Sequence, residues 1–175
     1  MGTWISFYVR ANGSEADTSG IRAKFPSARI ETGQEFIGVV LGDDTFEPPT
    51  DNLLKLSSEL NTDVIWLSFQ SAVDAFEFHH WRAGATVRSL VFGCYREERT
   101  WERAEGEPEP WERVAFFDLK GLRFALEYAK TDQEKKELER IWREAELLPG
   151  RTEPNIDSKA SAWKVAGHYH FPGWS

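Results

Sequence analysis

Three closely spaced runs of strand-forming residues constrain the fold of this chain more than any other feature. They occupy residues 63–70 (DVIWLSFQ), 75–82 (AFEFHHWR) and 86–95 (TVRSLVFGCY), and β-branched and aromatic side chains dominate each run. Between the second and third runs, Ala83 and Gly84 suit a tight hairpin turn. Strands joined this closely pair in antiparallel fashion, so the centre of the chain predicts an antiparallel sheet.

The remaining elements are predicted from apolar spacing and capping residues. Residues 3–10 predict a strand, and residues 28–32 and 35–42 predict a strand pair or one interrupted strand, with a short helix that begins at Ser14 between residues 10 and 28. Asp51 is expected to cap a leucine-striped helix, and a short strand is expected around Trp101 in an otherwise irregular segment. Three more helices are expected at residues 119–129, from Thr131 to residue 148, and from Asp157 to the HYHFPGW segment.

This order of elements predicts an α+β fold in a single domain, residues 1–175. We expect a mainly antiparallel sheet in residues 1–118, with a ferredoxin-like β-α-β unit at its N-terminal end. The C-terminal helices, residues 119–175, are expected to pack on one face of that sheet. A hydrophobic fraction of 41% in a chain of 175 residues is sufficient for one packed core.

Charge and cysteine content exclude several functional classes. The formal net charge of −8 disfavours binding to nucleic acid and to anionic membranes. With the single cysteine, Cys94, no intramolecular disulfide forms, and neither a signal peptide nor an apolar run of about 20 residues is found. We therefore expect a cytoplasmic protein without a membrane anchor.

Two segments resemble an uncharacterised bacterial protein family. The first is SAVDAFEFHHWRAGATVRSL, in which the matching positions are Ser71, Val73, Asp74, Phe76, Phe78, Trp81, Gly84, Arg88, Ser89 and Leu90. The second is GEPEPWE at residues 106–112, which is similar to a Gly-x-Pro-x-Pro-x-Glu segment of that family. The resemblance covers about the first two thirds of the chain. It implies a fold type and a bacterial cytoplasmic setting, but no reaction.

The chain departs from the family pattern at Arg82 and Ala83, where acidic residues are expected before the glycine. This departure weakens the idea of an acidic site at that turn.

The adjacent histidines of the second run raise the question of a metal or catalytic site. Side chains alternate along a strand, so His80 shares a face with the two phenylalanines, and His79 shares the other face with Glu77 and Trp81. The two imidazoles therefore cannot chelate one ion as neighbours. His168 and His170 offer another pair, but the clustered spacing of structural zinc sites is missing, and we predict neither a metal nor a cofactor.

Nucleophilic and acid–base chemistry have weak signals. Cys94 follows strand residues and precedes two arginines, yet a lone cysteine there is typical of packing. Glutamates crowd the segment between Trp101 and Trp111, a pairing that sugar-binding clefts also use, but we prefer the interpretation of a solvated acidic loop with two rings packed into the domain surface. Within this segment Glu112 is the best single candidate for acid–base work, because a proline-rich stretch fixes its approach.

The preferred functional prediction is a non-enzymatic module that binds a protein partner. Aromatic and arginine side chains of the kind found in interfaces concentrate in the segment 81–111, and we predict an exposed surface there. The candidate binding residues are Asp74, His79, Trp81, Arg88, Trp101, Trp111 and Glu112. The alternative is a hydrolase that uses Glu112 or a histidine-based metal site, with His79 and Glu112 in one pocket. A third hypothesis is self-association through an exposed sheet edge.

Overall fold

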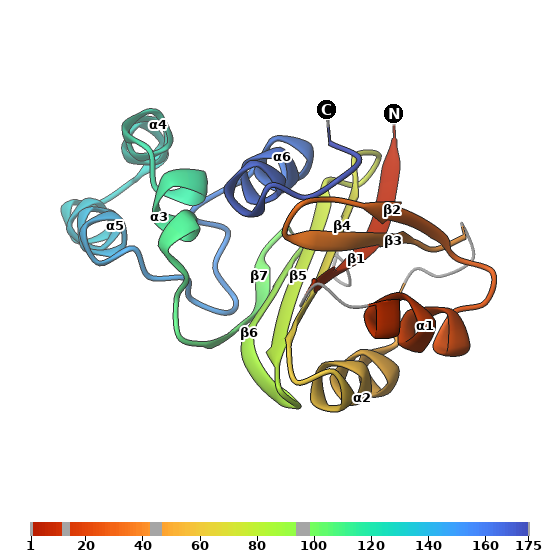
Figure 1. Cartoon of the computed structure of the whole chain (residues 1–175). Helices are drawn as coiled ribbons and strands as arrows, with labels where there is room; N and C mark the ends of the chain where they lie inside the picture. The colour runs from red at the N-terminus through yellow and green to blue at the C-terminus, as the bar shows by residue number, and fades with distance from the viewer. Residues whose placement is uncertain (1, 12–14, 43–46, 94–98, 175) are drawn as a thin grey trace.

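The computed structural model describes residues 2–11, 15–42, 47–93 and 99–174 (Figure 1). These residues form an α+β fold with seven strands and six helices. The strands are β1 (Thr3–Arg10), β2 (Arg29–Thr32), β3 (Phe36–Val40), β4 (Asp63–Gln70), β5 (Ala75–Arg82), β6 (Ala85–Phe92) and β7 (Trp101–Gly106). The helices are α1 (Glu15–Lys24), α2 (Thr50–Glu59), α3 (Pro110–Phe116), α4 (Leu119–Tyr128), α5 (Asp132–Glu144) and α6 (Ser158–Tyr169). The predicted cap at Ser14 and the thiol of Cys94 lie outside the described residues.

All seven strands belong to one sheet in the order β2-β3-β1-β4-β5-β6-β7, and every pairing in it is antiparallel. The antiparallel centre predicted from the sequence is therefore confirmed, and β7 is the short strand expected around Trp101. The sheet as a whole does not have a ferredoxin-like strand order, because β5, β6 and β7 continue it beyond β4.

Helices cover both faces of this sheet, and each face has its own hydrophobic core. On one face, Ile21 of α1 and Leu53 and Leu56 of α2 pack with Phe7 and Trp66. The opposite core lies under the C-terminal helices (Figure 1) and combines strand residues with residues of α3, α5 and α6. Because both faces are covered, β4 and β5 are buried along almost their whole length.

Local signals explain most helix boundaries. Thr131 and Asp157 cap α5 and α6 as expected, since their side chains accept hydrogen bonds from the backbone N–H groups of Glu134 and Ala160. The expected cap at Asp51 is wrong: α2 already begins at Thr50, after Pro49, and Asp51 lies in its first turn.

Helix α3 was not expected, because its sequence was interpreted as part of an irregular proline-rich loop. Its start carries a capping box in which Glu109 and Glu112 each accept a hydrogen bond from the other's backbone N–H group, with proline in the first turn. Proline at that position favours a helix start, since its missing N–H group would have no helical partner there. The box and the proline are the signals that identify this helix.

Gly106 at the end of β7 supplies a test of the fold. Its φ is +87°, and an added Cβ would lie 2.0 Å from the carbonyl oxygen of Val87 on β6. Gly150 has nearly the same φ, +86°, but a Cβ there meets nothing within 4 Å. We expect Gly150→Ala to cost about 1–2 kcal/mol of unfolding free energy for the left-handed backbone alone. Gly106→Ala should cost about 1–3 kcal/mol more, because the backbone of β6 or β7 must move to relieve the clash with the Val87 carbonyl oxygen. Urea denaturation of both variants measures the difference, and equal losses would contradict this register of β6 and β7.

Candidate functional site

The two adjacent histidines lie on opposite faces of the sheet, as strand alternation predicts. The Nδ1 atom of His79 is 2.8 Å from Ser89 Oγ on β6, on the face covered by α1 and α2. The Nδ1 atom of His80 is 2.5 Å from Glu109 Oε1, on the face covered by the C-terminal helices. The prediction that the two imidazoles form no common site is confirmed.

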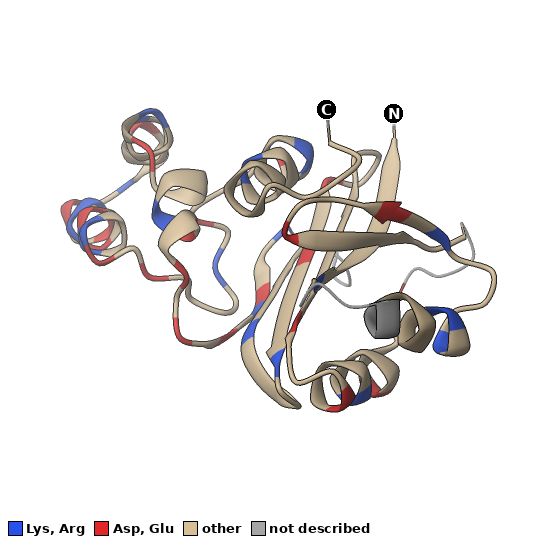
Figure 2. Cartoon of the chain, viewed as in Figure 1, with Lys and Arg blue, Asp and Glu red and all other residues tan. Residues whose placement is uncertain are grey.

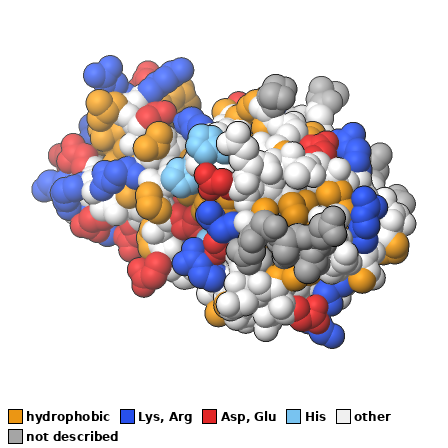
Figure 3. Space-filling model, in the orientation of Figure 1, with side chains coloured by type: hydrophobic (Ala, Val, Ile, Leu, Met, Phe, Trp, Pro, Cys, Tyr) orange, Lys and Arg blue, Asp and Glu red, His pale blue; other side chains and the backbone are white. Residues whose placement is uncertain are grey.

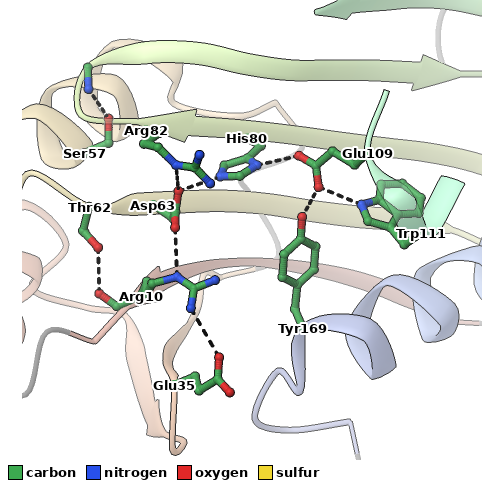
Figure 4. Close-up of polar contacts among 11 residues, drawn as sticks. Arg10, Glu35, Ser57, Thr62, Asp63, His80, Arg82, Glu109, Trp111 and Tyr169 are labelled. Carbon is green, nitrogen blue, oxygen red and sulfur yellow. Dashed lines mark hydrogen bonds and ion pairs between the residues drawn. The ribbon is translucent and has the colours of Figure 1, made fainter. Parts of the chain in front are cut away.

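His80 is held between two carboxylates in a buried charge network (Figure 4). Its Nε2 atom is 2.9 Å from Asp63 Oδ1 on β4, while Nδ1 contacts Glu109 at the cap of α3. Asp63 also accepts hydrogen bonds from Arg82 Nε at 2.6 Å and from Arg10 Nε at 2.8 Å. The network thus joins β1, β4 and β5 to the start of α3.

Glu109 extends this network to the last helix. Its Oε2 atom accepts a hydrogen bond from the indole Nε1 of Trp111 at 2.9 Å and another from the hydroxyl of Tyr169 near the end of α6. Figure 4 shows both side chains pointing at Glu109 from their separate helices. One carboxylate therefore fixes α3 and α6 against the sheet.

The pKa values in the network identify its charge state. Burial alone would lower the pKa of His80, but hydrogen bonds to Asp63 and Glu109 outweigh burial and raise it above its ordinary value. Burial alone would raise the pKa of both carboxyl groups, but their bonds to His80 hold each below its ordinary value. The raised pKa favours the imidazolium form of His80, and each of its two ring nitrogens already contacts a carboxylate, so neither nitrogen is open to a substrate or a metal ion.

The second buried charge pair contains Glu112, the predicted acid–base residue. Arg88 Nε and Nη2 donate to Glu112 Oε1 and Oε2 at 2.8 and 2.7 Å, and Arg88 Nη1 donates to the carbonyl of Gly106 at 2.8 Å. The side chains of Arg88 and Glu112 are 4% and 2% exposed. His79 lies across the sheet from this pair, so the single pocket expected for His79 and Glu112 does not exist.

The exposed aromatic surface predicted for residues 81–111 is also wrong. Trp81 is buried beneath α2, and Trp101 and Trp111 are buried in the core under the C-terminal helices. Their rings face inward because helices cover both sides of the sheet, which single-strand patterns do not reveal. Asp74 fastens the β4–β5 turn to the last helix, since it accepts a hydrogen bond from the backbone N–H of Ser158 at 2.7 Å and pairs with Arg99.

His79 and Ser89 line a small cavity of about 160 Å³ on the α2 face. Burial, together with Arg103, lowers the pKa of His79 to about 4, so the ring is neutral near pH 7 and its Nδ1 atom shares one hydrogen bond with the Ser89 hydroxyl. A hydroxyl bonded to a neutral imidazole is the arrangement in which serine nucleophiles are activated. A general base works best with a pKa near the working pH, so this ring is a weak base, and the pair fits a cross-strand structural bond.

A larger cavity, of about 520 Å³, lies among α4, α5, the start of α6 and the segment 152–157. We call it the helical groove. Its apolar lining includes Phe116, Phe124, Ala125, Tyr128, Leu138, Trp142 and Ile156. Its charged lining consists of Asp118, Lys120, Glu134, Glu153, Asp157 and Lys164. This volume falls in the range typical of small-molecule and cofactor pockets, roughly 300–1,000 Å³.

Helix α4, which forms one wall of the helical groove, has no buried residue. Leu119, Phe124 and Tyr128 on this helix are 71%, 55% and 67% exposed. Figure 3 shows hydrophobic side chains emerging among charged ones over this part of the molecule. The apolar spacing of residues 119–129 predicted the helix but not this exposure, because the pattern does not say whether the apolar face is covered.

The described residues contain neither a metal-binding group of side chains nor a membrane-spanning helix. Within the four described segments, no group of three or more His, Cys, Asp and Glu side chains is arranged to hold a metal ion. No helix in these segments is long and apolar enough to cross a membrane.

The two histidines should give opposite pH dependence of stability. The raised pKa of His80 stabilises the fold below about pH 6.5, and this contribution is lost as the pH rises through the folded-state pKa. The lowered pKa of His79 stabilises the fold above about pH 6.5, and up to about 3 kcal/mol is lost as the pH falls to 4. We expect His79→Gln to reduce the acid-side loss of unfolding free energy, and His80→Gln to reduce the alkaline-side loss. Urea titrations from pH 4 to 9 measure both, and parallel curves for the two variants would contradict the assignment.

Removing one partner of the Arg88–Glu112 pair should lower the unfolding free energy strongly, whereas replacing both partners with apolar residues should lower it little. Glu112→Ala leaves a buried guanidinium without its carboxylate, so we expect a loss of about 3–5 kcal/mol in unfolding free energy. The double variant Arg88→Met/Glu112→Leu removes both charges and should recover most of that loss. Denaturant midpoints compare the two proteins, and an exposed pair would instead show a loss of about 1 kcal/mol or less.

Comparisons of this chain with protein-family models, with curated proteins and with solved structures find no match.

Proposed function

We propose that this protein is a non-enzymatic module that binds a partner protein in the helical groove. The observation that carries the proposal is the exposure of α4. This amphipathic helix has no buried residue and exposes two aromatic rings beside a cavity of about 520 Å³. Contiguous apolar surface with a polar rim is typical of protein-interaction sites. Aromatic side chains at such positions contribute most to binding energy.

The state of the polar clusters supports binding over catalysis. Both ring nitrogens of His80 contact carboxylates, and Glu112 is held by two nitrogens of Arg88. Both clusters join strands to helices, which is a structural role. The hydroxyl–imidazole pair of Ser89 and His79 contains a base whose pKa of about 4 makes it weak near neutral pH.

The proposal also extends to the family and the fold unit. We propose that the chain belongs to the uncharacterised bacterial family that its motifs resemble, and that it acts in the cytoplasm as an immunity-type or regulatory partner. The element order β1-α1-β2-β3-α2-β4, with neighbours β2-β3-β1-β4, supports a ferredoxin-like unit within the first part of the sheet.

Site-specific photo-crosslinking in the organism that encodes the chain tests the proposed function. A benzophenone amino acid at position 124, in the groove wall, should give one dominant protein adduct, while the same group at position 114 should not. Val114 is the matched control because it is an exposed apolar residue, at 74%, on α3 and does not line the groove. The purified adduct partner should then bind 1:1, and Tyr128→Ala should weaken binding about tenfold or more. The same adducts from both positions, or no adduct at all, would exclude the helical groove as the binding site.

A further inference from the structure

We propose that the segment bound in the helical groove is an amphipathic helix with basic side chains, laid between α4 and α6. This inference rests on the proposed function and names the class of partner. Three features of the groove support it: the helical nature of its walls, the small side chains on one wall and the negative charge of its rim.

The walls of the groove favour a helix over an extended peptide. One wall is α4, and the other is the first turns of α6, with Ala160, Ser161 and Lys164 facing the cavity. An extended peptide is typically bound by adding a strand to an unpaired sheet edge. The residues that line this groove belong to helices and to the segment 152–157, and none belongs to a strand. Recognition between helices is therefore the mode that the groove offers.

Small side chains on α4 permit close approach of a helix backbone. Gly121, Ala125 and Ala129 recur at intervals of four residues and all line the groove. Residues four apart lie on one face of a helix, so Gly121 and Ala125 form a shallow channel along α4, with Ala129 at the C-terminal cap and Trp142 of α5 packed beside Gly121. Phe124 and Tyr128 also line the cavity and stand beside the channel, with ring centroids 4.8 Å apart. Two helices pack at about 8–10 Å when such ridges and channels interlock.

The apolar floor of the groove requires apolar side chains on the face of the partner helix that enters it. Phe116 from α3, Leu138 and Trp142 from α5 and Ile156 lie at the cavity. Each of these side chains also belongs to the core under the C-terminal helices, so the floor is rigidly packed. A partner helix would therefore present aliphatic or aromatic residues at i, i+3 or i+4, and i+7.

The rim of the groove is net negative. Asp118, Glu134, Glu153 and Asp157 contribute four carboxylates against two ammonium groups, from Lys120 and Lys164, which leaves a charge of −2. Figure 2 shows acidic and basic residues together on α5 and the neighbouring loops. Residues 119–175 as a whole carry ten Lys and Arg against nine Asp and Glu, so the negative charge is local to the rim. A helix with lysine or arginine on its polar face matches this rim.

An unbiased peptide selection tests the class of partner. A phage library of random peptides of about 16 residues is selected on the wild-type protein and counter-selected on Phe124→Ala/Tyr128→Ala, which removes the aromatic wall. We expect enriched sequences with helical apolar spacing and an excess of lysine and arginine. Backbone amide chemical shifts of Gly121, Ala125 and Ala129 should move when an enriched peptide is added.

A charge-matched pair of variants then tests the role of the rim. Glu153→Lys reverses a carboxylate that lines the groove, and Glu127→Lys makes the same reversal at an exposed residue of α4 outside it. Both change the net charge equally. We expect Glu153→Lys to weaken an enriched basic peptide about fivefold, and Glu127→Lys to weaken it less than twofold. Equal effects would overturn the assignment of a basic partner to this rim.

The outcomes separate this inference from the proposed function. Enrichment of acidic sequences, of proline-containing sequences, or of none beyond the counter-selection would overturn the basic-helix inference. The proposed function would still stand if the crosslinked partner from position 124 bound in a manner sensitive to Tyr128→Ala. If neither peptides nor a native partner contacted α4, both proposals would fall together.

Discussion

The placement of the C-terminal helices depends on the buried contact between His80 and Glu109. A cation on β5 is satisfied by Asp63 within the sheet and by Glu109 at the start of α3, and Glu109 in turn binds Tyr169 of α6. Burying a charged group without partners costs several kcal/mol, so α3 and α6 cannot shift without a large penalty. Helix α4 follows α3 in the chain and packs chiefly on α5, while α6, which Tyr169 ties to Glu109, forms the opposite wall of the helical groove.

The two faces of the sheet divide the molecule into a structural half and a half that offers a binding surface. The face under α1 and α2 buries Trp66 and Trp81, and its polar pair, His79 with Ser89, is satisfied across two strands. The other face supports a helical layer whose outermost helix, α4, leaves two aromatic rings exposed. The buried charged groups Arg88, Glu112 and Glu109 are each paired, because an unpaired buried charge would cost several kcal/mol. The uncovered apolar surface therefore lies at the edge of the helical layer, away from the charge networks.

Features that depend on neighbouring residues could be predicted from the sequence, and features that depend on distant residues could not. Alternation placed His79 and His80 on opposite faces, and the caps Thr131 and Asp157 located two helices, because these signals are local. Trp101 and Trp111 were assigned to a surface, yet both are buried, since a charged neighbourhood in sequence does not reveal which helix will cover a ring. Glu112 was predicted as an acid–base residue, whereas the structure places it in a buried ion pair with Arg88, which lies 24 residues away in the chain and meets it only in the folded protein.

The sequence by itself determined the strands, most helices and the face that each strand residue occupies. These properties follow from backbone geometry and from spacing of two or of about 3.6 residues, which act within a few residues. Only the tertiary structure decided which strands are covered on both faces, which charged side chains meet and where apolar surface is left exposed. Burial and polar contacts depend on segments far apart in the chain, such as those that carry Glu109 and Tyr169. A local sequence pattern does not show which distant segments will meet.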